Sequence, residues 1–390
     1  MIPPLLPAYA RNELAFDRGD GAYLYATNGR KYLDFASGIA VTALGHNHPH
    51  LVQALTEQAK KLWHVSNLFQ IPEQLRLAER LVANSFADTV FFGNSGAEAV
   101  ECALKIVRKY QHETGQPGRY RVIACTGSFH GRTLATLAAA GNEKYLKGFE
   151  PAVEGFDHVA YGNLNELRAR VTSETAAILI EPVQGEGGLR APPPNYLRGL
   201  REIADEFGLL LVYDEVQCGM GRTGKLFAHE WEGAPPDIMA VAKGLGGGFP
   251  VGACLATERA ASCMTAGSHG STFGGNPLAM AVGNAVLDVM LEAGFLDRVQ
   301  AMGDYFSARL AELIERYPTV FCEVRGRGLL AGLQCIVPNT ELVTKLRQDG
   351  LLAITAGDNV VRLAPPLIIT QAQIDEAVAM LDGAARSFAQ

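Results

Sequence analysis

The sequence lacks the features that mark several common classes of protein. No apolar run in its 390 residues approaches the ~18 residues that a membrane-spanning helix needs. Lysine and arginine form no long run, and the formal net charge is -7, so binding to nucleic acid has little electrostatic support. No internal repeat and no low-complexity tract is present. These absences predict a globular protein that neither crosses a membrane nor binds nucleic acid.

The cysteines also lack a redox or metal-binding spacing. There are seven, an odd number, and none forms a C-x-x-C motif. We therefore expect small buried hydrophobic side chains in a reducing cytosol. The start of the chain, Met1-Ile2-Pro3-Pro4-Leu5-Leu6, lacks the basic start and apolar core of a signal peptide. Together these features predict a cytoplasmic protein.

Three histidines, His46, His48 and His50, form a candidate metal-binding cluster. Alternate residues would share one face of a strand, but Pro49 breaks that regularity. No acidic or cysteine partner follows at a zinc-binding spacing. We expect these histidines to pack within a loop and predict no metal site.

What the sequence does contain predicts an α/β protein of two domains. Apolar content is 48% and charged content 19%, as in well-packed proteins, and the chain is long for one core. Short apolar runs alternate with helical periods, which argues for a mostly parallel sheet covered on both faces. The runs are Thr89–Phe92, Arg121–Cys125, Ala176–Ile180, Leu209–Tyr213, Ile238–Val241 and Ala253–Ala256.

The two ends of the chain have a different pattern. Residues 23–25 and 31–35 flank Asn28-Gly29, a strong hairpin signal. Beyond about residue 284, strands and helices mix in an α+β pattern. We therefore expect residues 51–284 to form a large domain and residues 285–390 a small one. Residues 1–50 would join the small domain through their hairpin, with a cofactor pocket at the rim between the domains.

Asp214 and Lys243 are the most informative residues. Each follows a buried apolar run, so both should lie at the C-terminal ends of neighbouring strands, where open α/β sheets bind ligands. Pyridoxal phosphate requires an amine for a Schiff base and a carboxylate partner for its pyridine nitrogen. A lone lysine is usually a solvated surface charge, but this pairing favours an enzyme. Since an isolated buried carboxylate is costly, Asp214 also needs a cationic partner.

The segment Phe91 to Ala99 predicts a strand, a tight turn and a helix start. Ser95 can cap the helix, whose first N–H groups then offer an anion site, and Gly96 would let a phosphate approach closely. An ordinary capped turn is the alternative for this segment taken alone. It is not the G-x-x-x-x-G-K-[ST] motif, and residues 244–248 lack the dinucleotide spacing G-x-G-x-x-G.

Several ordered segments resemble one family. They are Asn94-Ser95-Gly96-Ala97-Glu98-Ala99, Phe129-His130-Gly131-Arg132-Thr133, Glu181-Pro182-Val183-Gln184-Gly185-Glu186-Gly187-Gly188, Asp214-Glu215-Val216-Gln217, Lys243, and Ser271-Thr272-Phe273-Gly274-Gly275-Asn276-Pro277. Over nearly the whole chain the sequence resembles the class III (ω-amino) aminotransferases, of pyridoxal-phosphate fold type I. The resemblance implies a large, mostly parallel sheet of the seven-stranded type and a smaller α+β domain.

The resemblance also implies roles around the cofactor. Lys243 would hold pyridoxal 5'-phosphate and move the substrate proton, and Asp214 would keep the pyridine nitrogen protonated. Phe129 and Val216 would lie on the two ring faces, and Gln217 would bond the ring hydroxyl. The remaining cofactor-binding positions are Gly96, Ala97, Glu215 and Thr272. Thr272 would reach the phosphate from a neighbouring subunit, with Ser271 near the substrate, so a homodimer with shared active sites is expected. A Gly-rich surface turn is the alternative for these two residues.

Arg132 and Arg362 are the candidate carboxylate binders, because a guanidinium holds a carboxylate with two parallel bonds. The resemblance implies that Glu181 pairs with Arg362 while the amino donor is bound and releases it to 2-oxoglutarate. A surface salt bridge is the alternative for that pair, and it would contribute little.

The segment from Ser37 to His46 resembles the branch of the family that acts on N2-acetylornithine, although Thr42 replaces its common asparagine. Ile39 aligns with a tyrosine that binds the free amino-acid end in ornithine aminotransferases, so a capped α-amino group is expected. The implied reaction transfers the δ-amino group of N2-acetylornithine to 2-oxoglutarate, a step of arginine biosynthesis. Succinylornithine, N-succinyl-diaminopimelate, ornithine and 4-aminobutyrate are alternatives. A non-catalytic binding protein would predict damage to Lys243 or Asp214, and both are intact.

Overall fold

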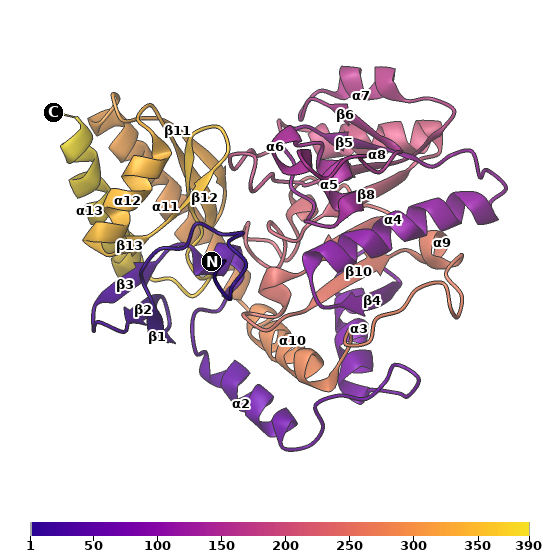
Figure 1. Ribbon diagram of the computed structural model, residues 1–390, viewed down its shortest axis with the longest axis horizontal. Coiled ribbons are helices and arrows are strands. Elements are labelled where there is room, and N and C mark those ends of the chain that lie inside the picture. The colour runs from indigo at the N-terminus through magenta and orange to yellow at the C-terminus, as the bar shows by residue number, and fades with distance from the viewer. Residues whose placement is uncertain (1, 390) are drawn as a thin grey trace.

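A computed structural model describes residues 2–389. Figure 1 shows a larger body around one central sheet and a smaller body that contains the C-terminal helix and the first strands. The larger sheet contains β4 (Thr89–Gly93), β5 (Arg121–Cys125), β6 (Phe156–Val159), β7 (Thr175–Ile180), β8 (Leu210–Asp214), β9 (Ile238–Val241) and β10 (Gly252–Ala256).

The strand order of this sheet is β4-β10-β9-β8-β7-β5-β6. Neighbouring strands from β9 through β6 run parallel, and β10 runs antiparallel to both β9 and β4. The predicted mostly parallel, seven-stranded α/β sheet is confirmed. All six apolar runs predicted from the sequence are strands of it, and β6 is the strand that the sequence analysis missed.

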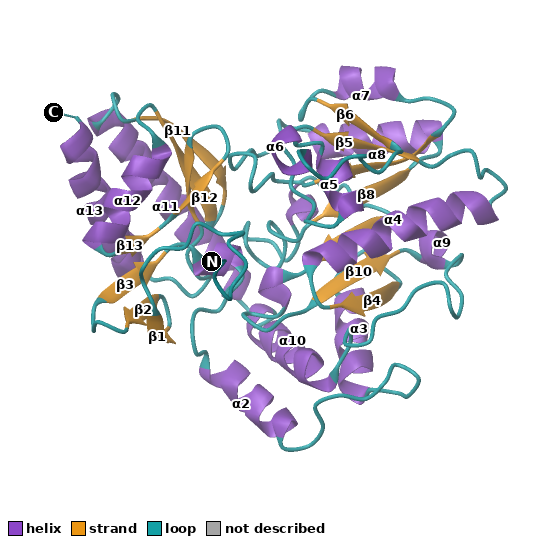
Figure 2. Ribbon diagram, in the orientation of Figure 1, coloured by secondary structure: helices purple, strands orange, loops and turns teal. Residues whose placement is uncertain are grey.

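Both faces of the sheet are covered. Alternate residues of β8 belong to different cores: Leu211 and Tyr213 pack in one, and Leu210 and Val212 in the other. The helices around the sheet are α3 (Pro72–Ala83), α4 (Gly96–Glu113), α5 (Leu134–Ala140), α6 (Glu143–Leu146), α7 (Leu164–Arg170), α8 (Tyr196–Phe207), α9 (Glu258–Ala261) and α10 (Pro277–Met290). Figure 2 shows helices distributed around the strands of this sheet, which is consistent with the burial that a parallel sheet requires.

The smaller body joins both ends of the chain. One sheet has the order β1-β2-β3-β13 and the other β11-β12-β15-β14. The strands are β1 (Phe16–Asp20), β2 (Tyr23–Ala26), β3 (Lys31–Asp34), β11 (Phe321–Arg327), β12 (Leu330–Cys335), β13 (Leu351–Leu352), β14 (Ile354–Ala356) and β15 (Val360–Leu363). The helices α11 (Phe295–Arg316), α12 (Asn339–Asp349) and α13 (Gln371–Phe388) pack beside them.

The N-terminal hairpin pairs with the C-terminal part of the chain, because Leu33 of β3 lies opposite Leu351 of the parallel β13. The helix α10 continues through residue 284, so a domain boundary placed there would cut a continuous helix. The division into 1–50, 51–284 and 285–390 stays a prediction.

Two short helical segments complete the description. The turn α1 (Ser37–Ala40) has left-handed backbone at Ser37, Gly38, Ile39 and Ala40, while α2 (Pro49–Ala59) is a regular helix that contacts α10. Within residues 2–389 no single helix has the length and apolar character of a membrane span. Only α10 and α11 taken together pass that test, and a 72° bend separates them.

Candidate functional site

Strands β8 and β9 end at one cavity of about 410 Å³. Asp214 is the last residue of β8, and Lys243 begins the short 3-10 helix η2 (Lys243–Leu245) just after β9. We call this the Lys243 cavity. Its lining residues are Val41, Asn94, Ser95, Gly96, Ala97, Phe129, His130, Gly131, Arg132, Glu181, Asp214, Val216, Gln217, Ala242, Lys243, Gly248, Phe249, Pro250 and Val251. Residues far apart in sequence therefore meet where strand ends bind ligands.

The amine of Lys243 is prepared to act as a nucleophile or base. Burial lowers its pKa from 10.5 to about 8, and the positive charge of Arg362 adds to the effect. Within residues 2–389 its side chain makes no hydrogen bond or ion pair. A lysine with a lowered pKa has a larger fraction of neutral amine at physiological pH.

His130 is the residue that pairs with Asp214, and it supplies a positive charge when it is protonated. Its Nδ1 lies 2.8 Å from Asp214 Oδ2, and both side chains are buried. Burial alone would lower the pKa of His130, but the hydrogen bond and charge of Asp214 outweigh it and raise that pKa. The second carboxylate oxygen accepts the N–H of Val216 at 3.0 Å. His130 and the N–H of Val216 therefore fix the Asp214 carboxylate at the end of β8.

The opposite side of the cavity is the beginning of α4. Ser95 caps this helix by accepting the N–H of Glu98 at 3.2 Å, as the sequence predicts. The first N–H groups of a helix lack partners within it and attract anions. Gly96 packs against Val216 so closely that a Cβ would lie 2.6 Å from its Cγ1. The lining residues Gly96 and Ala97 thus leave backbone within reach of a ligand.

Phe129 and Val216 both line the cavity, as expected for residues on either side of a flat ligand. Gln217 lines it too, but its Oε1 accepts a hydrogen bond from Arg362 Nη1 at 2.8 Å. The side chain of Gln217 thus connects the cavity to Arg362, a contact that the sequence analysis did not foresee.

Glu215 differs from the expectation that it contacts the cofactor. Its carboxylate accepts the N–H groups of Ala228 and His229 and lies 2.8 Å from His229 Nδ1. These groups belong to the 3-10 helix η1 (Ala228–Trp231), and Glu215 is absent from the cavity lining. Glu215 does not reach the cavity because its hydrogen bonds to Ala228 and His229 hold its side chain at η1. The neighbouring Asp214 does line the cavity.

The expected pairing of Glu181 with Arg362 is absent from this structure. Glu181 accepts the N–H groups of Phe129 at 2.9 Å and Gly185 at 3.0 Å. Burial, and then the charge of Asp214, raise the pKa of Glu181 to about 7. Arg362 Nη1 instead lies 2.6 Å from Oε1 of Glu186, in the same loop. Backbone donors already occupy Glu181, and Glu186 is the carboxylate that reaches β15.

Arg132, which lines the cavity, and Arg362, which contacts the lining residue Gln217, lie in different environments. Arg362 is 2% exposed, and its Nε is buried without a partner in the described chain. Arg132 lines the cavity and is exposed, with its guanidinium carbon 3.9 Å from the centre of the Tyr145 ring on α6. One is held rigidly and the other lies at the surface, and both have donors available to a carboxylate.

Ser271 and Thr272 lie in a second cavity of about 1180 Å³, which we call the Thr272 cavity. Neither residue lines the Lys243 cavity. Ser271 is nevertheless linked to the loop before α4, because its Oγ lies 3.3 Å from Asn94 Nδ2. Several exposed apolar side chains border the Thr272 cavity, among them Leu68, Phe69 and Leu75.

The histidines near residue 48 do not converge. His46 Nε2 lies 2.7 Å from Asp34 Oδ2, and His50 Nε2 lies 2.8 Å from Asp288 Oδ2. No group of three or more histidine, cysteine, aspartate or glutamate side chains among residues 2–389 is placed to hold a metal ion.

Comparison with known proteins identifies relatives that match nearly the whole chain. The family described as Aminotransferase class-III matches residues 7–384. A protein of Brucella melitensis named acetylornithine aminotransferase is 60% identical over 98% of this chain and 95% of its own length.

Solved structures give the same family at lower identity. The ornithine aminotransferase of Toxoplasma gondii superposes with a TM-score of 0.95 at 32% identity, covering 99% of this chain and 93% of its own. The N-acetylornithine aminotransferase of Stenotrophomonas maltophilia has a TM-score of 0.86 at 38% identity, covering 97% of each chain. Because these substrates differ while the folds agree, substrate choice depends on the site and not on the fold.

Proposed function

The chain belongs to the class-III aminotransferase family, and on that premise we propose that it transfers the δ-amino group of N2-acetylornithine to 2-oxoglutarate. One observation carries the proposal: Lys243, Asp214 and Arg132 line one cavity that Gln217 connects to the buried Arg362. The products would be N-acetylglutamate 5-semialdehyde and glutamate, in arginine biosynthesis.

The Lys243 cavity fits pyridoxal 5'-phosphate. Its groups are an amine of lowered pKa, a buried carboxylate, a phenyl and a valyl side chain, and the start of α4. Asp214 would hold the pyridine nitrogen, Phe129 and Val216 the ring, and the backbone at Gly96 and Ala97 the phosphate. When bound, this cofactor supplies a carbonyl carbon that amines attack and a ring that accepts electrons.

Lys243 and Asp214 have separate tasks in this proposal. Lys243 Nζ would take the proton from the amino-bearing carbon of the substrate and deliver it to the reacting carbon of the cofactor, which its lowered pKa permits near neutral pH. Asp214 keeps a proton on the pyridine nitrogen, and His130 stabilises the carboxylate for that task. His130 is therefore a positioning residue that acts through Asp214.

The two arginines distinguish the two substrates. The amino donor has one carboxylate, which we assign to Arg132. The dicarboxylate 2-oxoglutarate has a second, which we assign to the buried Arg362. Arg362 Nη1 forms an ion pair with Glu186 in this structure. We therefore propose Glu186, in place of Glu181, as the residue that neutralises Arg362 while the amino donor is bound.

Two observations favour an acylated donor. Ile39 lies on the left-handed turn before the lining residue Val41, and its apolar side chain offers no partner to a free α-amino group. The Brucella relative, named acetylornithine aminotransferase, is also far more similar in sequence than the Toxoplasma ornithine aminotransferase. The acyl group could still be succinyl, because a pocket discriminates weakly against a small extension.

The active enzyme in this proposal is a homodimer. Thr272 lies in a cavity different from that of Lys243, so its role at the phosphate needs a second copy of the chain. The exposed Leu68, Phe69 and Leu75 would be covered in that dimer. The cytoplasm is the proposed compartment, since all seven cysteines are free and six of them are buried.

The direct test incubates purified holoenzyme with N2-acetylornithine and 2-oxoglutarate and quantifies glutamate. We expect glutamate to form in equal amount to the semialdehyde, and Lys243→Ala to abolish both. Formation of neither product by protein that carries its full complement of pyridoxal phosphate would contradict the proposed function and favour a binding role.

A further inference from the structure

The loop that carries Glu186 is attached to the smaller body by one turn. Residues 357–359 connect β14 to β15, and the N–H of Gly357 donates to the backbone oxygen of Glu186 at 2.8 Å. Arg362 lies on β15, three residues after the end of this turn, and pairs with the carboxylate of Glu186. The backbone and the side chain of Glu186 are thus bound to the same hairpin.

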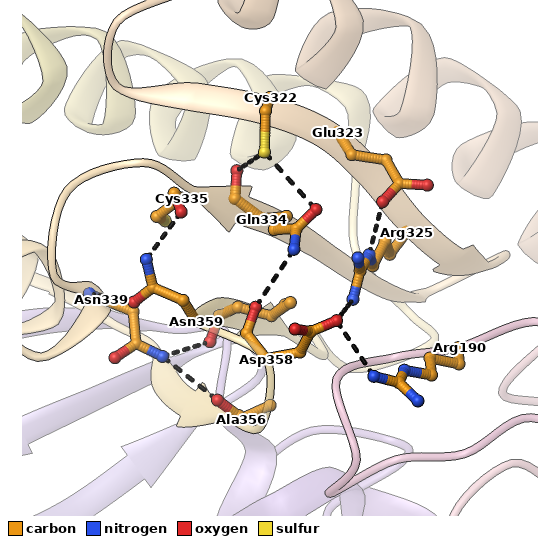
Figure 3. Close-up of polar contacts among 11 residues, drawn as sticks. Arg190, Cys322, Glu323, Arg325, Gln334, Cys335, Asn339, Ala356, Asp358 and Asn359 are labelled. Carbon is orange, nitrogen blue, oxygen red and sulfur yellow. Dashed lines mark hydrogen bonds and ion pairs between the residues drawn. The ribbon is translucent and has the colours of Figure 1, made fainter. Parts of the chain in front are cut away.

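Asp358 strengthens this attachment from the tip of the turn. Its Oδ2 accepts Arg190 Nη2 at 3.1 Å and Arg325 Nη1 at 2.6 Å (Figure 3). Arg190 forms a backbone bridge with Gln184 and so closes the loop that contains Glu186. Arg325 comes from β11 of the smaller body. The Asp358 carboxylate therefore joins the Glu186 loop to β11 and to the β14–β15 turn of the smaller body.

The turn itself is rigid on the side of the smaller body. Asn359 Nδ2 donates to the backbone oxygens of Cys335 and Val337, at 2.6 and 2.9 Å. Asn339 Nδ2 donates to those of Ala356 and Val360, on either side of the turn (Figure 3). Asp358 is therefore held at a fixed point on the smaller body, and its bond to Arg190 fixes the loop relative to that point.

The Glu186 loop and the turn at 357–359 approach each other so closely that no side chain fits at the point of contact. A Cβ on Gly188 would lie 2.8 Å from the backbone oxygen of Gly357, and Gly188 has a φ of +109° that other residues rarely adopt. A Cβ on Gly357 would lie 3.0 Å from the backbone oxygen of Glu186. The two glycines permit the close approach of the Glu186 loop to the turn at 357–359. Asp358 adds an ion pair with Arg190 to that contact.

We propose that Asp358, through Arg190 and Arg325, is a positioning residue that holds Glu186 against Arg362 and so tunes the discrimination between dicarboxylate and monocarboxylate substrates. This inference rests on the proposed function only for the identity of the substrates. Loosening the loop would leave Arg362 without its counter-ion for more of the time. A dicarboxylate would then compete less with Glu186 and bind more tightly.

The test uses the holoenzymes of the wild type, Asp358→Asn and Arg190→Gln, which remove the bond from its two sides. Glutarate, a dicarboxylate without a reactive carbonyl, is titrated by calorimetry. The KM values for 2-oxoglutarate and N2-acetylornithine are measured in parallel. Glu206→Gln is the matched control, because Glu206 pairs with Arg168 at 2.6 Å on the surface of the larger body.

We expect both variants to bind glutarate about two- to fivefold more tightly, since part-exposed ion pairs contribute modestly. The KM for 2-oxoglutarate should fall by a similar factor, while the KM for N2-acetylornithine and all values of Glu206→Gln stay at wild-type levels. In a Glu186→Ala background, Asp358→Asn should change nothing further, because its effect passes through Glu186.

Unchanged glutarate affinity in both Asp358→Asn and Arg190→Gln would overturn the inference. So would the same shift persisting in the Glu186→Ala background. Failure of the proposed function has a different signature: wild-type holoenzyme would not transaminate N2-acetylornithine, while the glutarate titrations would still decide the role of Asp358.

Discussion

Lys243 determines how the active site responds to pH. Burial and the charge of Arg362 lower the pKa of its amine from 10.5 to about 8. Because the folded pKa lies below the unfolded one, the protonated amine destabilises the cofactor-free protein below pH 8. That penalty fades as the pH rises from about 8 to 10.5.

The same pKa predicts the rate of cofactor uptake. Only the neutral amine attacks a carbonyl, and a pKa of about 8 makes about 10% of it neutral at pH 7. We expect the rate at which apoenzyme gains the visible absorbance of bound pyridoxal phosphate to rise about fivefold from pH 7 to 8. It should then level off above pH 9. A rate that still rises tenfold per pH unit above pH 9 would show an unperturbed lysine.

The buried pair of His130 and Asp214 predicts a loss of both stability and cofactor affinity on substitution. His130→Ala leaves Asp214 buried without its partner, which should lower the free energy of unfolding by about 3–5 kcal/mol. The pKa of His130 is raised in the folded state, so its charge-dependent contribution is full below pH 6.5. That contribution is lost as the pH rises through the raised value. Urea denaturation between pH 5.5 and 9 measures this profile.

A second buried pair provides the control. His229 lies 2.8 Å from Glu215 and is absent from the lining of the Lys243 cavity. His229→Ala should also destabilise the protein but should leave the affinity for pyridoxal phosphate at the wild-type value. Equal losses of cofactor affinity in the two variants would mean that His130 has only a structural role.

Two pairs of residues show which side-chain contacts the sequence could predict and which it could not. The sequence predicted that Lys243 and Asp214 lie together, because both follow buried apolar runs. It required a cation for Asp214 but could not name His130, which is 84 residues away in the chain. Glu181 and Glu186 belong to one loop, and only the folded backbone shows which carboxylate has local N–H donors and which reaches Arg362.

Among the elements, the short helix α6 matters because it supports Arg132. The ring of Tyr145 stacks on that guanidinium at 3.9 Å and meets Phe129 edge-on. We expect Tyr145→Ala to raise the KM for N2-acetylornithine about two- to fivefold, because the free energy of an exposed cation–π contact corresponds to about that factor in affinity. Tyr145→Phe keeps the ring and should keep the KM. If both variants raise the KM equally, the hydroxyl and not the ring face is responsible.

The contact between α4 and the segment after β8 makes Gly96 sensitive. A Cβ there would lie 2.6 Å from Val216 Cγ1, so Gly96→Ala must displace Val216. We expect about 1–3 kcal/mol of destabilisation and weaker binding of pyridoxal phosphate.

The matched substitution is Gly383→Ala, in the interior of α13, where a Cβ meets nothing within 4 Å. It should raise stability by up to about 1 kcal/mol through helix propensity and leave cofactor binding unchanged. Thermal unfolding and equilibrium dialysis of the cofactor check both variants. A Gly96→Ala protein with wild-type cofactor affinity would contradict the close approach of backbone and ligand.

The strands that could be predicted from the sequence are those formed by nearly continuous runs of apolar residues. The strand β6 escaped because Phe-Asp-His-Val carries two polar residues at the sheet edge, and β1 escaped because Phe-Asp-Arg-Gly-Asp is mostly polar. The left-handed turn at Ser37 to Ala40 has no simple sequence signal, since only one of its residues is a glycine. Its support comes from Asp34, which accepts the N–H groups of Ala36 and Ser37.

For the whole molecule, the separation of Thr272 from the Lys243 cavity predicts shared active sites. Hybrid dimers of Lys243→Ala and Thr272→Ala chains contain one site with both native residues. Random assembly should therefore restore about a quarter of wild-type activity. Activity no higher than the average of the two parents, in a sample where mass spectrometry detects hybrids, would contradict a site completed across the interface.

The identity of the amino donor is the central claim, and one comparison tests it most directly. The value of kcat/KM is measured for N2-acetylornithine, ornithine and 4-aminobutyrate, each with saturating 2-oxoglutarate. Because Ile39 offers no partner to a free α-amino group and the Brucella relative at 60% identity is named acetylornithine aminotransferase, we expect N2-acetylornithine to have the highest value. A value for ornithine or 4-aminobutyrate far above that for N2-acetylornithine would contradict the account.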